Sequence, residues 1–199
     1  MKHIFFEKRK SRNSDYNFPC GNKDKISSEV YEVFDWSKTV IGGSYALNMF
    51  TCPKWESNDI DVMIKTTNQE DFNAEINRIV TGTNATIIKQ RWGINKYNPI
   101  QSDQEEFNKT VLGTCTLKIE NIDKPIQLVA IETGNKTLLS TLNEITDKPA
   151  CISYTVENGK KMFHIPEKCS EALFTKKISR VDICQSRISK YTERNYQFE

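Results

Sequence analysis

Two short motifs in the first third of the chain carry residues suited to chemistry on phosphates. The first is Gly42-Gly43-Ser44 and the second is Asp59-Ile60-Asp61. Glycines let the backbone turn sharply and approach an anion, and the free amides at the start of a following helix point at that anion. The Ser44 hydroxyl adds one more hydrogen-bond donor. The first motif therefore predicts a binding site for a chain of phosphates.

The second motif lies in Asp59–Ile64, where polar and apolar residues alternate. Period-two alternation is typical of a strand, so Asp59 and Asp61 should project from one face. Two adjacent carboxylates repel each other, and a cation between them relieves that repulsion. Carboxylate oxygens suit Mg²⁺ and Mn²⁺, and paired ions of this kind serve phosphoryl transfer. We expect Asp59 and Asp61 to bind Mg²⁺ or Mn²⁺.

Local patterns predict the elements that position these motifs. The β-branched run Thr39–Ile41 ends at the two glycines, and Tyr45–Phe50 contains good helix formers. The order is therefore strand, tight turn, helix, loop and strand. Further helices are expected over Ile26–Phe34, from Phe72 to a stop near Gly82, and over Lys136–Glu144. A further strand is expected over Ala85–Lys89. Two hairpins are expected, one of Val111–Ile122 with Ile126–Ile131 and one of Ile152–Val156 with Met162–Ile165.

In this order, Gly-Gly-Ser, a short helix, a loop and Asp-Ile-Asp-Val resemble the DNA polymerase beta-like nucleotidyltransferase superfamily over roughly residues 39–131. The resemblance implies an α+β fold, with a mixed or antiparallel sheet flanked by helices. It also implies that Gly42, Gly43 and Ser44 bind a nucleoside triphosphate such as ATP. Asp59, Asp61 and a third carboxylate would hold two metal ions and activate a hydroxyl acceptor, which is an RNA end, a protein or a small molecule.

The position expected for the third carboxylate is occupied by Gln127. A glutamine amide is a poor ligand for magnesium. If Asp123-Lys124 is a two-residue hairpin loop, Glu120 pairs with Gln127 and faces the site, so Glu120 or Gln127 would complete it. Asp147 is a weaker substitute. The alternative is a catalytically inactive descendant that binds nucleotide, nucleic acid or a partner protein.

The chain divides into an irregular lead-in at 1–25, a nucleotidyltransferase-like core at 26–165 and a C-terminal helical segment at 166–199. Basic residues recur through the last segment, where one helix would carry them: Lys176, Lys177, Arg180, Arg187, Lys190 and Arg194. They either face the nucleotide or form an ordinary solvated face. The segment also looks similar, loosely, to tails of nucleotidyltransferase-like proteins from large DNA viruses and phages.

Composition narrows the classes of function and location to consider. With 28 basic and 26 acidic residues, bulk charge gives no reason to expect nucleic-acid binding. The N-terminal apolar run is too short for a signal peptide or membrane span, so we expect no membrane partner and a cytoplasmic protein, in the host cytoplasm if viral. Six cysteines without a Cys-x-x-Cys pair favour reduced, buried thiols over a zinc site. A less favoured alternative is an unrelated α/β domain whose glycines form an ordinary turn.

Overall fold

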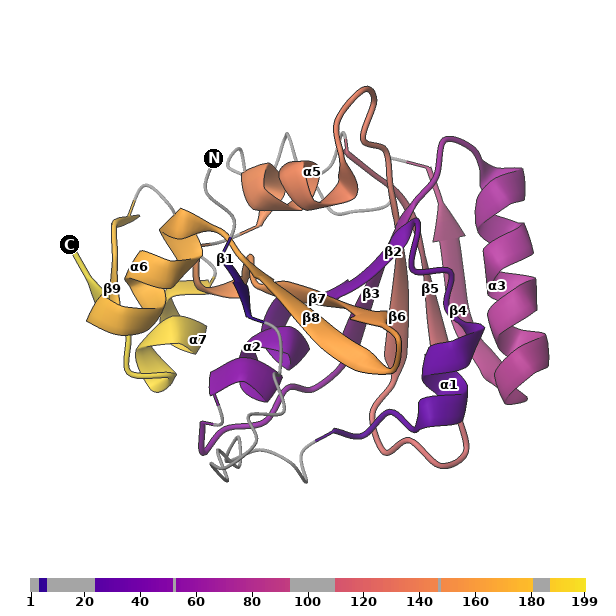
Figure 1. Ribbon diagram of the computed structural model, residues 1–199, viewed down its shortest axis with the longest axis horizontal. Coiled ribbons are helices and arrows are strands. Elements are labelled where there is room, and N and C mark those ends of the chain that lie inside the picture. Colours follow the sequence, from indigo (N-terminus) through magenta and orange to yellow (C-terminus); the bar gives the residue numbers. More distant parts are fainter. Residues whose placement is uncertain (1–3, 7–23, 52, 94–109, 147, 181–186) are drawn as a thin grey trace.

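The computed structural model describes residues 4–6, 24–51, 53–93, 110–146, 148–180 and 187–199. Within these residues, eight strands form one sheet in the order β1-β8-β7-β2-β3-β6-β5-β4, with helices on both faces (Figure 1). The pair β3 and β6 is parallel, and the other neighbouring strands of this sheet are antiparallel. The predicted α+β class with a mixed sheet and flanking helices is confirmed.

The bounds of the elements are as follows. The strands of the large sheet are β1 Ile4–Phe6, β2 Thr39–Gly42, β3 Ile60–Lys65, β4 Thr86–Trp92, β5 Val111–Lys118, β6 Ile126–Ile131, β7 Ser153–Glu157 and β8 Lys160–Ile165. The helices are α1 Ser28–Val33, α2 Gly43–Thr51, α3 Gln69–Thr83, α5 Leu138–Ile145, α6 Glu167–Thr175 and α7 Ile188–Glu193, with a 3₁₀ turn, η3, at Lys148–Ala150.

The two faces of the sheet are packed by different helices. Alternate residues of β3, such as Val62, enter the larger core together with residues of α1, α2 and α3. The intervening positions point to the other face, where Met63 and Val129 pack against Leu138 and Leu142 of α5. Because side chains alternate along a strand, the face shared with α5 is also the face of Asp61.

Helix α3 ends at Thr83, one residue beyond Gly82, near which the stop was predicted. Asn68 caps its start by accepting a hydrogen bond from the Asp71 amide at 2.9 Å. Its C-cap is Asn84, whose φ of 52° lies in the left-handed region. Gly82 serves packing instead, because a Cβ at this position would lie 2.8 Å from the Val33 side chain of α1. Gly82 therefore allows α1 and α3 to approach closely.

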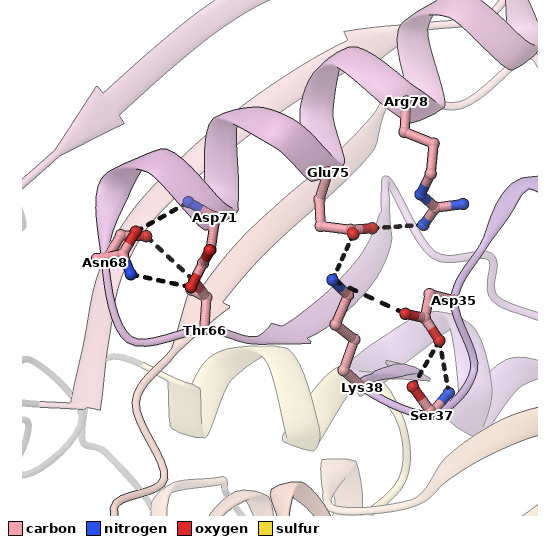
Figure 2. Close-up of polar contacts among 8 residues, drawn as sticks. All are labelled: Asp35, Ser37, Lys38, Thr66, Asn68, Asp71, Glu75 and Arg78. Atoms are coloured by element: carbon pink, nitrogen blue, oxygen red, sulfur yellow. Dashed lines mark hydrogen bonds and ion pairs between the residues drawn. The ribbon is translucent and has the colours of Figure 1, made fainter.

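A buried carboxylate joins α3 to the connection before β2 (Figure 2). Glu75 is 6% exposed and forms ion pairs with Lys38, at 2.5 Å, and with Arg78. Lys38 also lies 3.8 Å from Asp35. Two cations compensate the cost of burying this one carboxylate, so the network stabilises the contact between α3 and the segment that leads into β2.

We expect Glu75→Gln to lower the free energy of unfolding by about 1–2 kcal/mol. The amide keeps the shape of the side chain but no longer neutralises Lys38 and Arg78, which are partly solvated. Urea denaturation monitored by circular dichroism measures the change. Glu70→Gln, an exposed change in the first turn of the same helix, is the control and should cost about 0.5 kcal/mol or less. Equal losses in the two variants would contradict a role for the network.

The connection between β5 and β6 differs from the predicted two-residue hairpin loop. Gln127 pairs with Thr116, and the chain between the strands spans residues 119–125. The Ile122 amide donates to the Ile119 carbonyl at 3.1 Å, and both isoleucines are buried. Because Ile119 and Ile122 are apolar, the sequence pattern of the strand appeared to continue through them, although they belong to a buried turn. The predicted pairing of Glu120 with Gln127 is therefore wrong, and Glu120 is an exposed residue of this turn.

The second predicted hairpin is confirmed, and the described residues of the lead-in have defined partners. Glu157 pairs with Lys160 across the Asn158-Gly159 loop. Ile4–Phe6 is not irregular, because it pairs with β8 as an edge strand. Asp24 also has defined contacts, since it accepts hydrogen bonds from the hydroxyls of Tyr31 and Tyr45.

The C-terminal segment is only partly helical. Between α6 and α7 the chain forms β9, Lys177–Ile178, which pairs in parallel with β10, Gln197–Phe198. Lys176 ends α6 with a φ of 58°, so the basic residues do not follow one helix as predicted. Tyr191 and Tyr196 pack with residues of η3, α6 and β9 in a separate small cluster. This cluster attaches the segment to the body of the protein.

Three further expectations concern the cysteines, the polar segments and membrane spans. Cys115, Cys151 and Cys169 are buried thiols, as predicted, and the other cysteines lie outside the described residues. Asp147 and most of the polar segment 92–109 also lie outside them. Within the described part of the chain, the helices are too short or too polar to cross a lipid bilayer.

Candidate nucleotide site

Strand β2 passes directly into α2 at the Gly42-Gly43 step. Gly43 has a φ of 68°, which is left-handed and favours glycine. A Cβ on Gly43 would lie 2.6 Å from Oδ2 of Asp61, so the backbone and this carboxylate are in direct contact. Gly42 is also the register partner of Asp61 on β3. The glycine turn and the Asp61 carboxylate therefore form one continuous surface.

The register of the sheet places one polar side chain, that of Gln127, directly beside Asp61. Gly42, Asp61, Gln127 and Thr116 are successive partners across β2, β3, β6 and β5. Side chains at matched positions share one face of a sheet, so Gln127 stands beside Asp61. Among the residues described, no group of three or more His, Cys, Asp or Glu side chains could hold a metal ion. The carboxylate pair is therefore accompanied by an amide.

Asp59 lies immediately before β3, which begins one residue later than predicted. The pKa of Asp61 is raised from 3.8 to about 7, mainly by burial and also by the negative charge of Asp59, while the positive charges of Lys190 and Arg187 act to lower it. A carboxylate with this pKa is about half-protonated at neutral pH unless a further cation binds beside it. The pair thus suits a divalent cation, and its two carboxylates with one amide fit one ion better than two.

Basic side chains of the C-terminal segment approach the same carboxylates. Arg187, Lys190 and Arg194 recur at three- and four-residue steps at and beside α7, the spacing of one helix face. Burial lowers the pKa of Lys190, while the charges of Asp59 and Asp61 act to raise it. The site therefore combines negative charge from β3 with positive charge from α7, which suits a ligand that carries both a cation and anionic groups.

Arg194 connects α7 to the first motif. Its Nη1 donates a hydrogen bond to Oγ of Ser44 at 3.1 Å, and Ser44 is only 7% exposed. The guanidinium carbon of Arg194 lies 3.7 Å from the centroid of the Trp55 ring, in the connection between α2 and β3. The side-chain amide of Asn48 on α2 donates to the Trp55 carbonyl at 2.5 Å. Arg194 is thus fixed between the serine and the tryptophan.

The structure brings together most of the predicted site residues. Those that lie close are Gly42, Gly43, Ser44, Asp59, Asp61 and Gln127, whereas Glu120 is in the exposed turn. Sequence reasoning did not assign Arg194 or Trp55 to the site. The recurring basic residues pointed toward Arg194 but were placed on one long helix, and no pattern in the sequence distinguished Trp55.

Comparison with known proteins gives little further information. No family model matches the chain, and no curated protein sequence matches it. Among the solved structures that match is a CCA-adding enzyme in complex with CTP, with a TM-score of 0.47 and 10% sequence identity. The match covers 88% of this chain and 40% of that enzyme's chain, so the chain spans well under half the length of that protein.

Proposed function

We propose that the chain binds a nucleoside triphosphate together with a divalent cation. The observation that carries this proposal is the contact between the Gly43 backbone and the Asp61 carboxylate. A phosphate chain needs amide and hydroxyl donors, and its cation needs carboxylates. Groups of both kinds lie next to each other at the junction of β2, α2 and β3.

Each group of residues in the site would have its own role in this binding. The first turn of the nine-residue helix α2 offers unpaired amides, and the Ser44 hydroxyl lies in that turn. Asp59 and Asp61 would hold Mg²⁺ or Mn²⁺, with the Gln127 carbonyl oxygen as a weaker third ligand. A bound cation of this kind would neutralise charge on the triphosphate. Lys190 and Arg187 offset the remaining negative charge.

A second candidate function is transfer of the nucleoside monophosphate to a hydroxyl acceptor. The paired carboxylates favour it, because burial and the neighbouring charge of Asp59 raise the pKa of Asp61, a cost that phosphate binding alone does not require. In this reaction the acceptor oxygen bonds to the α-phosphorus, the bond to the bridging oxygen breaks, pyrophosphate leaves, and the acceptor proton passes to water. This function ranks second because an amide, Gln127, rather than a carboxylate stands beside Asp61, and because Glu120 lies in the turn.

One experiment separates the two functions. The protein is titrated calorimetrically with each nucleoside triphosphate in the presence of Mg²⁺, Mn²⁺ or EDTA. Pyrophosphate release is then followed with labelled nucleotides and total RNA or protein as acceptors. Metal-dependent binding without pyrophosphate supports binding alone, and pyrophosphate release supports transfer. If no nucleotide binds with either metal, the proposal is wrong.

We expect Gln127→Asp to tighten Mg²⁺ or Mn²⁺ binding roughly tenfold, because it adds a charged oxygen ligand next to Asp61. If transfer is weak or absent in the natural protein, the same change should raise pyrophosphate release. Isothermal titration with Mn²⁺ measures the affinity. Glu120→Gln is the matched control and should change neither quantity, because Glu120 lies in an exposed turn. Unchanged metal affinity in Gln127→Asp would show that position 127 does not reach the ion.

A further inference from the structure

We propose that Arg194 is a positioning residue that holds the Ser44 hydroxyl as a hydrogen-bond donor toward a polyphosphate. The inference rests on the proposed nucleotide binding and makes part of the C-terminal segment a component of the site. Its starting point is the hydrogen bond from Arg194 Nη1 to Ser44 Oγ at 3.1 Å.

The direction of this hydrogen bond is fixed by chemistry. A guanidinium has donors and no acceptor, so the Ser44 oxygen must accept. A serine hydroxyl has one hydrogen and two lone pairs, so the hydrogen of Ser44 is left to donate elsewhere. Ser44 is 7% exposed and stands at the start of α2, beside Gly43. Its hydrogen is therefore available to an anion at the glycine turn.

Arg194 is itself held in place before any ligand arrives. Its guanidinium stacks on the Trp55 ring at 3.7 Å, and the Tyr191 ring lies 5.7 Å away. The Arg194 amide donates to the Tyr191 carbonyl at 3.1 Å, and Tyr191 is fully buried in the small C-terminal cluster. Because its rotamer is already restricted, Arg194 loses little conformational entropy when an anion binds.

The positive charge of Arg194 also restricts what the pair can recognise. Arg194 and Ser44 together offer charge and a hydroxyl donor, which complement phosphate oxygens and contribute nothing to a neutral base. The chemical feature read by this pair is the phosphate chain. Inorganic tripolyphosphate, which has no base, sugar or bound metal, is therefore a direct probe of it.

The test measures binding of tripolyphosphate and of each Mg²⁺–nucleoside triphosphate by calorimetry. Arg194→Ala should weaken both by roughly tenfold, the loss expected for one hydrogen bond to a charged group. Arg194→Lys keeps the charge but lacks the planar fork, so it should recover part of that loss. Arg180→Ala removes the same charge from an exposed position of the same segment and should leave affinity unchanged.

A double-mutant cycle separates positioning from bulk charge. If Arg194 acts through Ser44, Arg194→Ala should have little further effect once Ser44→Ala is present. Additive losses, or equal losses in Arg180→Ala, would overturn the inference. Thermal unfolding of each variant shows whether a loss of affinity comes from loss of fold, and partial recovery in Arg194→Lys excludes that explanation.

The outcomes distinguish the inference from the proposed function. Binding of tripolyphosphate but of no nucleotide, with the Arg194 effect intact, would support the inference and contradict nucleotide binding. Nucleotide binding that is insensitive to Arg194→Ala would contradict the inference alone. If the natural protein binds neither probe, both are wrong.

Discussion

Changing both Asp59 and Asp61 to asparagine is expected to weaken Mg²⁺-dependent nucleotide binding by at least about 100-fold. In the proposed site the two carboxylates would supply the charged oxygen ligands, and an amide is a poor substitute for either. Calorimetric titration with the nucleotide that binds the natural protein, with and without Mg²⁺, measures the effect. Glu70→Gln combined with Glu171→Gln removes two negative charges from exposed helix positions and should leave affinity unchanged.

Asp61→Asn alone should make the metal-free protein more stable at neutral pH. The folded-state pKa of Asp61 is raised from 3.8 to about 7, mainly by burial. Between these values the folded protein holds a proton that the unfolded chain has released, so stability falls as pH rises toward 7. Asparagine removes that dependence and should add about 1–2 kcal/mol at pH 8. Denaturation in EDTA at pH 5 and pH 8 tests this, and an unchanged pH dependence would contradict it.

Gly43→Ala should be the most damaging single substitution at the site. The left-handed φ of 68° is unfavourable for alanine, and the new Cβ would lie 2.6 Å from Asp61 Oδ2. The carboxylate or the start of α2 must shift, and either movement would separate the proposed phosphate donors from the proposed metal ligands. We expect a loss of about 1–3 kcal/mol in stability and at least about 100-fold in nucleotide affinity.

Gly159→Ala is the matched control for this substitution. Gly159 has a φ of 71°, and a Cβ there meets no atom within 4 Å. It therefore reproduces the backbone strain without the collision. The expected pattern is a smaller destabilisation in Gly159→Ala than in Gly43→Ala, with nucleotide binding lost only in Gly43→Ala. Equal affinities would show that the contact between Gly43 and Asp61 is not required for binding.

Local patterns were sufficient to predict the centre of the site. The strand before Gly42, the helix after it and the alternation around Asp61 each depend on neighbouring residues. Sequence reasoning also assigned Gln127 to the position beside Asp61, although that assignment came from a family resemblance. In the described residues these predictions agree with the register of β2, β3 and β6.

Other predictions failed where tertiary contacts outweighed local patterns. Ile119 and Ile122 looked like a continued strand because they are apolar, and only the fold shows that a turn buries them. The same error led to the wrong prediction that Glu120 faces the site. The contact between Arg194 and Ser44 joins residues far apart in the chain, and no sequence period reports such a contact. Apolar spacing likewise does not reveal that the chain forms β9 before α7.

The parallel pairing of β3 with β6 has a consequence for the order of folding. The strand partners Asp61 and Gln127 are separated along the chain by α3, β4 and β5. Contacts between residues distant in sequence carry a large loop-closure entropy and form slowly. The glycine turn, by contrast, joins elements that follow one another directly. During refolding, nucleotide binding should therefore recover with the slowest kinetic phase, after most helical signal has returned.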